Sequence, residues 1–293
     1  MRVIAVLAFV LAGCQLTPTK EGAGTQRREF DVLVDRAEKP LVIGEKTAVL
    51  DARKSFDYGL NRIEGSLHLP WESLAESAAS GEELRDPRKA GLKLSLMGLE
   101  PGSQVIVVGY GPLGAGEEGR VAWSLLRLGF QDVQVATADM FRKNWTQRPS
   151  APRENVPAWP VNPRADLQIE LEEFRKLAFD LKSRVADKIF VLDVRSEKEY
   201  FNRADAKSAP DIQAMNVPWT EFYTAKGRPN PKLAARLQAL SIAPGDRVIL
   251  ISNTGVRSGA AAYALLAPGF KHVQNFTGGW DLPGPFDRRR LLG

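Results

Sequence analysis

Length, composition and charge place this chain among ordinary globular proteins. Its 293 residues suggest about two domains, and a composition of 44% hydrophobic and 26% charged residues leaves enough apolar side chains for two cores. The net charge of +5 comes from 40 basic residues interleaved with 35 acidic ones, and no stripe of aromatic and basic residues indicates nucleic-acid binding. The densest basic run, residues 288–290, is interpreted as a solvated tail rather than a patch for phosphate or lipid headgroups.

The amino terminus has the pattern of a secretion signal. A positive charge at Arg2 precedes an apolar run over residues 3–12, which is too short for a bilayer span of about 20 residues but suits a signal peptide. The run ends in Leu-Ala-Gly-Cys at residues 11–14, which resembles the bacterial lipobox. The resemblance implies cleavage before Cys14, acylation of its sulfur, and a firm membrane anchor of several acyl chains.

This interpretation makes residues 1–13 a lipoprotein signal peptide and residues 14–30 a lipidated, flexible tether. Gln15 follows the cysteine at a position where aspartate favours retention in the inner membrane. We therefore expect a lipid-anchored protein of the bacterial cell envelope, on the outer membrane and facing the periplasm. An ordinary signal peptide that happens to contain a cysteine, or a buried strand, is the alternative.

Cysteine and histidine counts restrict the chemistry of the mature chain. Cys14 is the only cysteine, so its acylation leaves no thiol, no disulfide and no cysteine metal ligand. The two histidines, His68 and His272, are isolated from each other in the sequence and do not make a zinc or iron site. No dinucleotide-binding motif and no phosphate-binding loop motif occurs. The sequence therefore predicts no metal and no cofactor.

Four blocks of the first half recur in the same order in the second half. The paired blocks are residues 48–53 and 190–195, 69–71 and 217–219, 101–108 and 244–251, and 125–130 and 265–270. Such a repeat predicts two copies of one domain. We place the copies at residues 31–147 and 166–293, with the Pro-rich residues 148–165 as the linker between them.

The second copy shows the elements of the domain most clearly. Residues 248–251 form a β-branched run typical of a strand buried on both faces, and residues 258–266 are an Ala- and Leu-rich helix that stops at Pro268. A further short strand begins at Val273. Strand, helix and strand at this spacing predict a parallel sheet covered by helices, in which ligands lie at the carboxyl ends of the strands. The loop after Ile251 is therefore the candidate site.

Short motifs at the expected strand ends share one resemblance. They are Ser252-Asn253-Thr254-Gly255-Val256-Arg257-Ser258, Leu192-Asp193-Val194-Arg195, Asn216-Val217-Pro218 and Gly278-Gly279-Trp280. Together they resemble the rhodanese (thiosulfate sulfurtransferase) family. The resemblance implies an α/β fold of two rhodanese-like domains, each a parallel β-sheet flanked by helices on both faces. It also implies a six-residue loop, from Ser252 to Arg257, whose backbone N–H groups hold an anion or a persulfide.

The motifs depart from the family at the residues that carry its chemistry. Ser252 occupies the position of the catalytic cysteine, and the matching position of the first copy is Gly109. A hydroxyl cannot form a persulfide, and a serine without a paired base is a poor nucleophile at neutral pH. Glu199 replaces a substrate-binding arginine of the thiosulfate-using members, and Arg257 aligns with Glu117 in the first copy. We therefore predict no catalytic residue.

The first copy has degenerated further than the second. Its loop after Gly109 is longer, rich in glycine and acidic, so we do not expect it to hold an anion. Its counterpart of the Gly-Gly-Trp motif is Ala138-Asp139-Met140.

A candidate anion site remains in the second copy. Its members are Ser252, Asn253, Thr254, Gly255, Val256, Arg257 and Ser258. The pairs Asp51 with Arg53 and Asp193 with Arg195 are interpreted as braces for the loops rather than as acid–base catalysts. A loop that is merely inherited and empty is an equally weighted alternative. A serine hydrolase is disfavoured, because His272 is expected at the opposite end of the sheet and the loop lacks a Gly-x-Ser-x-Gly elbow.

Three functions remain open. The first is a non-catalytic binding or scaffolding lipoprotein of the envelope, which captures a protein partner. The second is a binding protein for a small oxyanion, held by residues 252–258. The third is a sulfurtransferase that works without cysteine.

Overall fold

The computed structural model describes residues 40–77, 79–201 and 212–280. The lipobox, Cys14 and the basic run at residues 288–290 lie outside these ranges. The described strands are β1 (Ala48–Asp51), β2 (Arg62–Ile63), β3 (Leu67–His68), β4 (Gln104–Gly109), β5 (Asp132–Thr137), β6 (Trp145–Thr146), β7 (Ile189–Asp193), β8 (Met215–Asn216), β9 (Arg247–Ile251) and β10 (His272–Asn275). The described α-helices are α2 (Ser55–Leu60), α3 (Pro87–Leu96), α4 (Glu117–Arg127), α5 (Leu171–Phe179), α6 (Leu181–Ala186), α7 (Glu197–Phe201), α8 (Leu233–Gln238) and α9 (Val256–Leu266).

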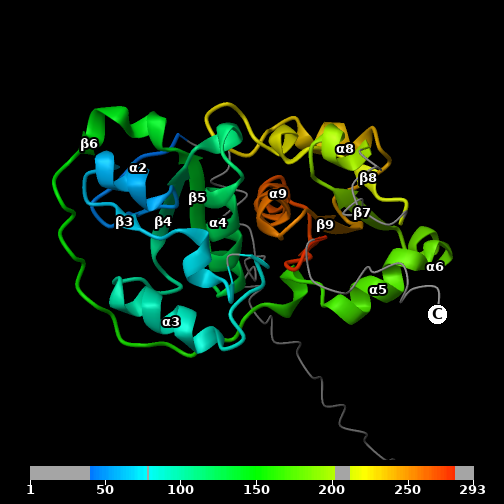
Figure 1. The fold of residues 1–293 in the computed structure, drawn as a ribbon, viewed down its shortest axis with the longest axis horizontal. Coiled ribbons are helices and arrows are strands. Elements are labelled where there is room, and N and C mark those ends of the chain that lie inside the picture. Colours follow the sequence, from blue (N-terminus) through cyan, green and yellow to red (C-terminus); the bar gives the residue numbers. More distant parts are fainter. Residues whose placement is uncertain (1–39, 78, 202–211, 281–293) are drawn as a thin grey trace, which may run out of the picture.

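Two four-stranded parallel sheets, one in each half of the chain, have the same topology. Their strand orders are β3-β1-β4-β5 and β8-β7-β9-β10. In each sheet the first strand of the chain is an inner one and the second lies at one edge. The third strand pairs with the other side of the first, and the fourth forms the opposite edge. The two sheets lie on either side of α4 and α9 (Figure 1). This arrangement confirms the predicted α/β class with parallel sheets flanked by helices.

Alternate residues of the inner strands face two different cores. In β9, Val248 and Leu250 belong to the large apolar cluster that also includes α9, whereas Ile249 and Ile251 belong to a cluster formed with α5. All four side chains are fully buried. Burial on both faces explains why this strand reads as a continuous apolar run in the sequence.

Helix α9 begins two residues earlier than the sequence predicts, at Val256 instead of Ser258. The residue before it, Gly255, has a φ of 76°, a left-handed conformation that favours glycine. The chain therefore turns into the helix at Gly255, and Arg257 already lies in the first helical turn.

The two halves share one continuous core. The large apolar cluster takes residues from both sheets and from α4 and α9, and these two helices pack on each other across the boundary. Gly119 of α4 comes so close to Ala260 of α9 that a Cβ atom at position 119 would overlap it. Polar contacts cross the same boundary, since the Tyr263 hydroxyl donates to the carbonyl of Val133 at 2.9 Å.

The Pro-rich connection packs against the first half over part of its length. The N–H of Val156 donates to the carbonyl of Ser95 at 3.0 Å, and the N–H of Arg164 donates to that of Arg127 at 2.8 Å. A Cβ atom at Gly91 of α3 would overlap the side chain of Val161. These contacts fix the connection to α3 and α4.

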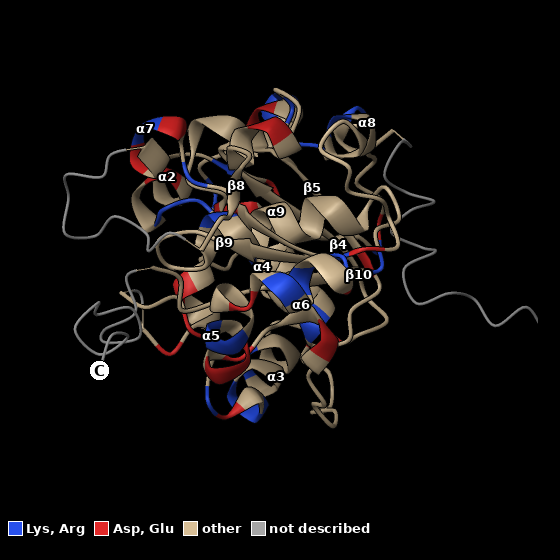
Figure 2. Ribbon diagram, turned by 90° about the vertical axis from the view of Figure 1, so that its right-hand side faces the viewer, with Lys and Arg blue, Asp and Glu red and all other residues tan. Residues whose placement is uncertain are grey.

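The ribbon of α6 carries basic residues and that of α7 carries residues of both signs, whereas most of α9 is uncharged (Figure 2). Among the described residues, no helix combines the length and the apolar character needed to cross a membrane.

Candidate functional site

The loop that follows β9 holds the hydroxyl of Ser252 in a buried hydrogen-bond pair. Ser252 is 1% exposed, and its Oγ lies 3.1 Å from the Oγ of Ser258. The backbone N–H of Ser258 also donates to the Ser252 Oγ at 3.3 Å. This hydroxyl lies at the carboxyl end of the sheet, and the first turn of α9 holds it there.

The backbone N–H groups of residues 253–257 surround the start of α9. None of them donates to another described group of the protein. They stand at the N-terminus of an eleven-residue helix, where the helix dipole is positive. Unused N–H groups at such a position have the polarity that favours an anion.

Arg257, which the sequence assigns to the anion loop, is engaged by Glu199 of α7. Its two terminal nitrogens each donate to a separate carboxylate oxygen of Glu199 at 2.8 Å. The Arg257 guanidinium, together with hydrogen bonds from Ser196, lowers the pKa of Glu199 to about 2. Glu199, which stands where the resemblance implies a substrate-binding arginine, therefore compensates the charge of Arg257.

Two glycines from outside the Ser252 loop pack closely against its backbone carbonyl groups. Gly279, with a φ of 61°, lies so close that a Cβ atom there would overlap the carbonyl oxygens of Ser252 and Asn253. Gly81 from the first half of the chain comes equally close to the carbonyl of Thr254. The loop is therefore covered by backbone from both halves.

Asp193 and Arg195 form a buried brace beside the loop. The guanidinium of Arg195 donates to both carboxylate oxygens of Asp193, at 3.0 and 2.7 Å. Trp280 completes the group, since its indole N–H donates to Asp193 at 3.1 Å and its ring lies 5.7 Å from the Arg195 guanidinium carbon. All three side chains are less than 10% exposed. Each partner is satisfied internally, so the group holds the strand ends.

The matching brace of the first half recruits a different tryptophan. Asp51 and Arg53 pair as their counterparts do, at 3.0 and 2.7 Å. The ring of Trp145 lies 5.5 Å from the Arg53 guanidinium carbon. Met140, which the sequence aligns with Trp280, is 38% exposed. Sequence alignment missed Trp145 because it stands five positions beyond the expected motif.

In the first half, a glutamate occupies the space beside Gly109, the residue that the sequence aligns with Ser252. Gly109 ends β4, and a Cβ atom there would overlap the carboxylate of Glu118 from α4. Glu118 is 1% exposed, and its Oε2 has no described hydrogen-bond partner. Burial raises its pKa to about 7, although backbone N–H groups of Glu118 and Gly111 lower it in part. The neighbouring Glu117 accepts a hydrogen bond from the N–H of Ala115 at 2.8 Å.

The histidines lie away from the Ser252 loop. His272 starts β10 and pairs in register with Arg247, at the opposite end of the sheet from Ser252. The Nε2 of His68 lies 2.8 Å from the carbonyl of Arg53 in the first half. Among residues 40–77, 79–201 and 212–280, no group of three or more His, Cys, Asp or Glu side chains could hold a metal ion.

Comparison with known families identifies the second half. The family model described as the rhodanese-like domain matches residues 175–282, which include the Ser252 loop, the Asp193–Arg195 brace and Trp280. No curated protein matches the chain significantly.

Solved structures with the same fold include sulfur-transfer proteins. The chain resembles EanB in complex with ergothioneine at a TM-score of 0.68 and 18% identity, over 84% of this chain and 64% of that one. It resembles the anaerobic ergothioneine biosynthesis enzyme of Chlorobium limicola at 0.68 and 17%, over 83% and 63% of the two chains. It resembles SseA of Escherichia coli, from a study of 3-mercaptopyruvate sulfotransferases, at 0.65 and 16%, over 80% and 93%. The chain thus spans less than two thirds of the EanB chains, and at these identities the likeness shows the fold alone.

Proposed function

We propose, on the premise that residues 175–282 form a rhodanese-like domain, that this protein is a non-catalytic binding or scaffolding module of the cell envelope. In this proposal both halves are rhodanese-like, and a lipidated Cys14 attaches the chain to a membrane. The observation that carries the proposal is the buried Ser252 hydroxyl, held by Ser258 at 3.1 Å, at the position that the sequence motif assigns to the cysteine of the family.

The chemistry of the hydroxyl supports the loss of catalysis. Persulfide formation needs a thiolate, and the only cysteine of the chain, Cys14, is the predicted lipidation residue. Activation of Ser252 as a nucleophile would need a base within hydrogen-bond reach, and its described side-chain neighbour is another serine. A rhodanese fold with serine in this place keeps its shape but has no group that accepts sulfur.

Ligand binding by a protein with serine in place of a cysteine has a parallel among the similar structures. One of them is an EanB variant with a cysteine replaced by serine, in complex with hercynine. This parallel supports a role in which partners are held and released unchanged at the carboxyl ends of the strands.

Sulfur transfer from thiosulfate to cyanide tests the proposal on the full chain. We expect wild type and Ser252→Ala to give the same background rate. A wild-type rate above background that Ser252→Ala abolishes would overturn the proposal. Mass spectrometry of the protein from its native membrane tests the anchor, with diacylglycerol on Cys14 as the expected result and an unmodified or persulfidated Cys14 as the opposite one.

A second candidate function, the binding of a small oxyanion, is favoured by the unused N–H groups of residues 253–257. The Glu199 carboxylate opposes it, because it compensates the charge of Arg257. Calorimetry with sulfate separates the two functions. If the loop binds anions, Glu199→Gln should tighten sulfate binding about tenfold and Arg257→Ala should weaken it. Equal and negligible heats for wild type and both variants would exclude the site.

A further inference from the structure

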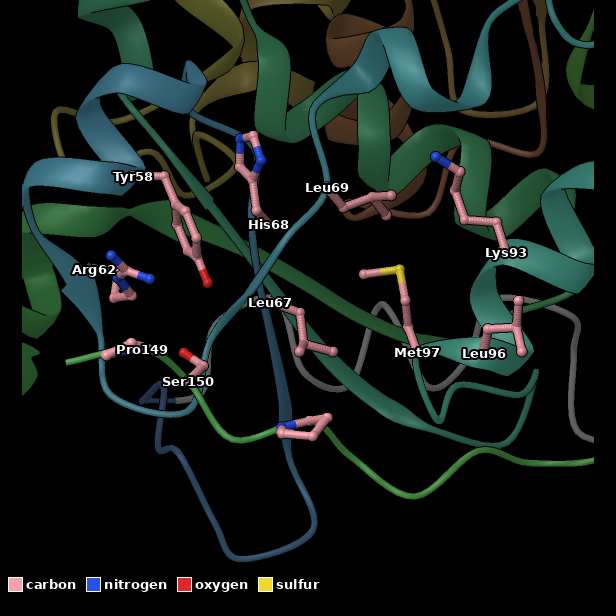
Figure 3. A pocket seen from close by; sticks show the side chains of 11 residues that line it. Tyr58, Arg62, Leu67, His68, Leu69, Lys93, Leu96, Met97, Pro149 and Ser150 are labelled. Carbon is pink, nitrogen blue, oxygen red and sulfur yellow. The ribbon is translucent and has the colours of Figure 1, made fainter. Parts of the chain in front are cut away.

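A groove in the first half, separate from the Ser252 loop, has the dimensions of a ligand site. Its volume is about 630 Å³, within the usual range for pockets that hold small molecules. Figure 3 shows the residues that line it, which come from α2, β2, β3, α3 and the start of the Pro-rich connection. They are Tyr58, Arg62, Leu67, His68, Leu69, Lys93, Leu96, Met97, Pro149, Ser150 and Pro152.

Apolar side chains form the middle of the groove. Leu67, Leu69 and Met97 lie between the basic side chains of Arg62 and Lys93, and Leu96 lies beside Lys93 on α3 (Figure 3). Leu96 is 57% exposed, although it belongs to a helix that buries other apolar residues. Removal of such a surface from water by a hydrocarbon chain is favourable, at about 25 cal/mol per Å².

The walls of the groove are held in place. The rings of Tyr58 and His68 stack at 4.7 Å, and the Nε2 of His68 is fixed at 2.8 Å from a backbone carbonyl, to which it must donate. Pro149 and Pro152 also line the groove, and they have restricted backbones and no N–H group to offer a ligand. A preformed groove costs a ligand little in ordering of the protein.

The charges that line the groove all have one sign. Arg62 and Lys93 lie at its two ends, and none of the lining residues is acidic. Neither makes an ion pair with an acid in the part of the chain that the structure describes. Arg62 is used internally, since its guanidinium stacks 4.7 Å above the Tyr58 ring and donates to the carbonyl of Gly59 at 3.2 Å. Lys93 is exposed at the rim and remains open to a ligand anion.

We infer that this groove binds an amphipathic anion, namely a single hydrocarbon chain that ends in a carboxylate. The chain lies on Leu67, Leu96 and Met97, and the carboxylate pairs with Lys93 at the rim. The inference goes beyond the proposed function and does not depend on whether Cys14 is lipidated.

Titration of the full chain with cis-parinarate, a fluorescent chain carboxylate, tests the inference. We expect saturable binding that dodecanoate, kept below its micelle concentration, displaces and that dodecyltrimethylammonium does not. No saturable binding, or equal displacement by the cation, would overturn the inference.

Matched variants on α3 assign the binding to the groove. Leu96→Glu, inside the groove, should weaken cis-parinarate about tenfold, because a carboxylate then lies in the apolar floor and repels the ligand. Leu92→Glu is the control, since Leu92 is 54% exposed on the same helix but does not line the groove. Equal affinities for the two variants would place the binding elsewhere and refute the inference.

The role of Lys93 can be tested against Lys89, which lies one turn earlier on α3. Lys93→Gln should weaken cis-parinarate about threefold, the value of one exposed ion pair, whereas Lys89→Gln should leave the affinity unchanged. Both lysines are exposed on α3, so neither change threatens the fold. The same affinity for both variants would contradict the proposed role of Lys93.

Discussion

In both halves a loop leads from an inner strand into a helix, but different side chains fill the space at the strand end. In the second half, a pair of small hydroxyls fills the space at the strand end and the N–H groups of residues 253–257 stay unused. In the first half, Gly109 leaves room for the Glu118 carboxylate, and Glu117 caps the N–H of Ala115. The N-terminus of α4, where the helix dipole is positive, thus carries two acidic side chains of its own. The described N–H groups of residues 253–257 in the second loop have no such carboxylate partner.

The covering segments differ in the same way. Over the second loop, Gly279 brings backbone against backbone and Trp280 bonds to the brace. Over the first, residues 138–140 keep side chains, Met140 is partly exposed, and Trp145 reaches the brace from further along the chain. Among the described covering segments, close backbone approach that leaves no room for a Cβ atom therefore occurs at Gly279 and not at the matching Asp139.

The largest effect should come from a side chain placed under the covering segment of the second half. Gly279→Ala sets a Cβ atom against two carbonyl oxygens at a φ of 61°, so we expect a loss of about 3 kcal/mol or more in the free energy of unfolding. Urea denaturation measures it. The control is Asp139→Ala at the matching position, where the side chain is exposed and the change should stay within about 0.5 kcal/mol. Similar losses of unfolding free energy at positions 279 and 139 would show that the covering segments of the two halves do not differ in their tolerance of a side chain.

Glu118 should give the first half a pH dependence. Burial raises its folded pKa from 4.5 to about 7, so between these values the folded state binds more protons than the unfolded state. Stability is complete below pH 4.5, falls by about 3 kcal/mol as the pH rises to 7, and then levels off. Urea denaturation at pH 5 and pH 8 should show this fall in wild type.

Glu118→Gln should abolish that fall, and Glu117→Gln should leave most of it in place. A Glu118→Gln variant with the wild-type pH dependence would show that another group is responsible.

Serine at positions 109 and 118 tests whether the serine pair of the second half can replace the Gly109 and Glu118 arrangement of the first half. Gly109→Ser alone should cost about 2 kcal/mol, because the new side chain meets the buried Glu118 carboxylate. In the double variant with Glu118→Ser, the space is restored, so a double-mutant cycle should give a favourable coupling of about 1 kcal/mol. Strict additivity of the two changes would mean that the two side chains do not compete for this space.

The smallest effect should come from the exposed side of the second loop. The pKa of Glu199 is lowered from 4.5 to about 2, so its contribution to stability is present above pH 4.5 and is lost as the pH falls toward 2. Because its side chain is 35% exposed, solvent screening limits this contribution to less than about 1 kcal/mol. Glu199→Gln should therefore reduce stability slightly at pH 6 and not at pH 2.5. A loss of the same size at both values would point to packing instead of charge.

The sequence predicted those features that depend on local pattern. The repeated blocks and the apolar run at residues 248–251 predicted parallel sheets, because strands buried on both faces leave a continuous apolar signal. The serine at position 252 and the glycine at position 109 could be located by motif spacing alone.

The rest depends on contacts between distant residues. Glu199 and Arg257 are 58 positions apart, and no local pattern shows that they form an ion pair. The Glu118 carboxylate beside Gly109 follows from the packing of α4 on β4. Trp145 replaces Trp280 in space without matching it in the alignment, because a ring can reach the same guanidinium from another point of the chain.

The segment at Gly81, from the first half, covers the loop of the second half at Thr254. Its backbone rests against Thr254, and the buried Arg120 anchors it by donating to the Gly81 carbonyl at 2.7 Å. Any molecule that approaches Thr254 from this side must first lift a segment belonging to the other half. A second half produced on its own would lack the Gly81 segment. Its loop would then be more exposed to solvent at Thr254 than in the intact chain.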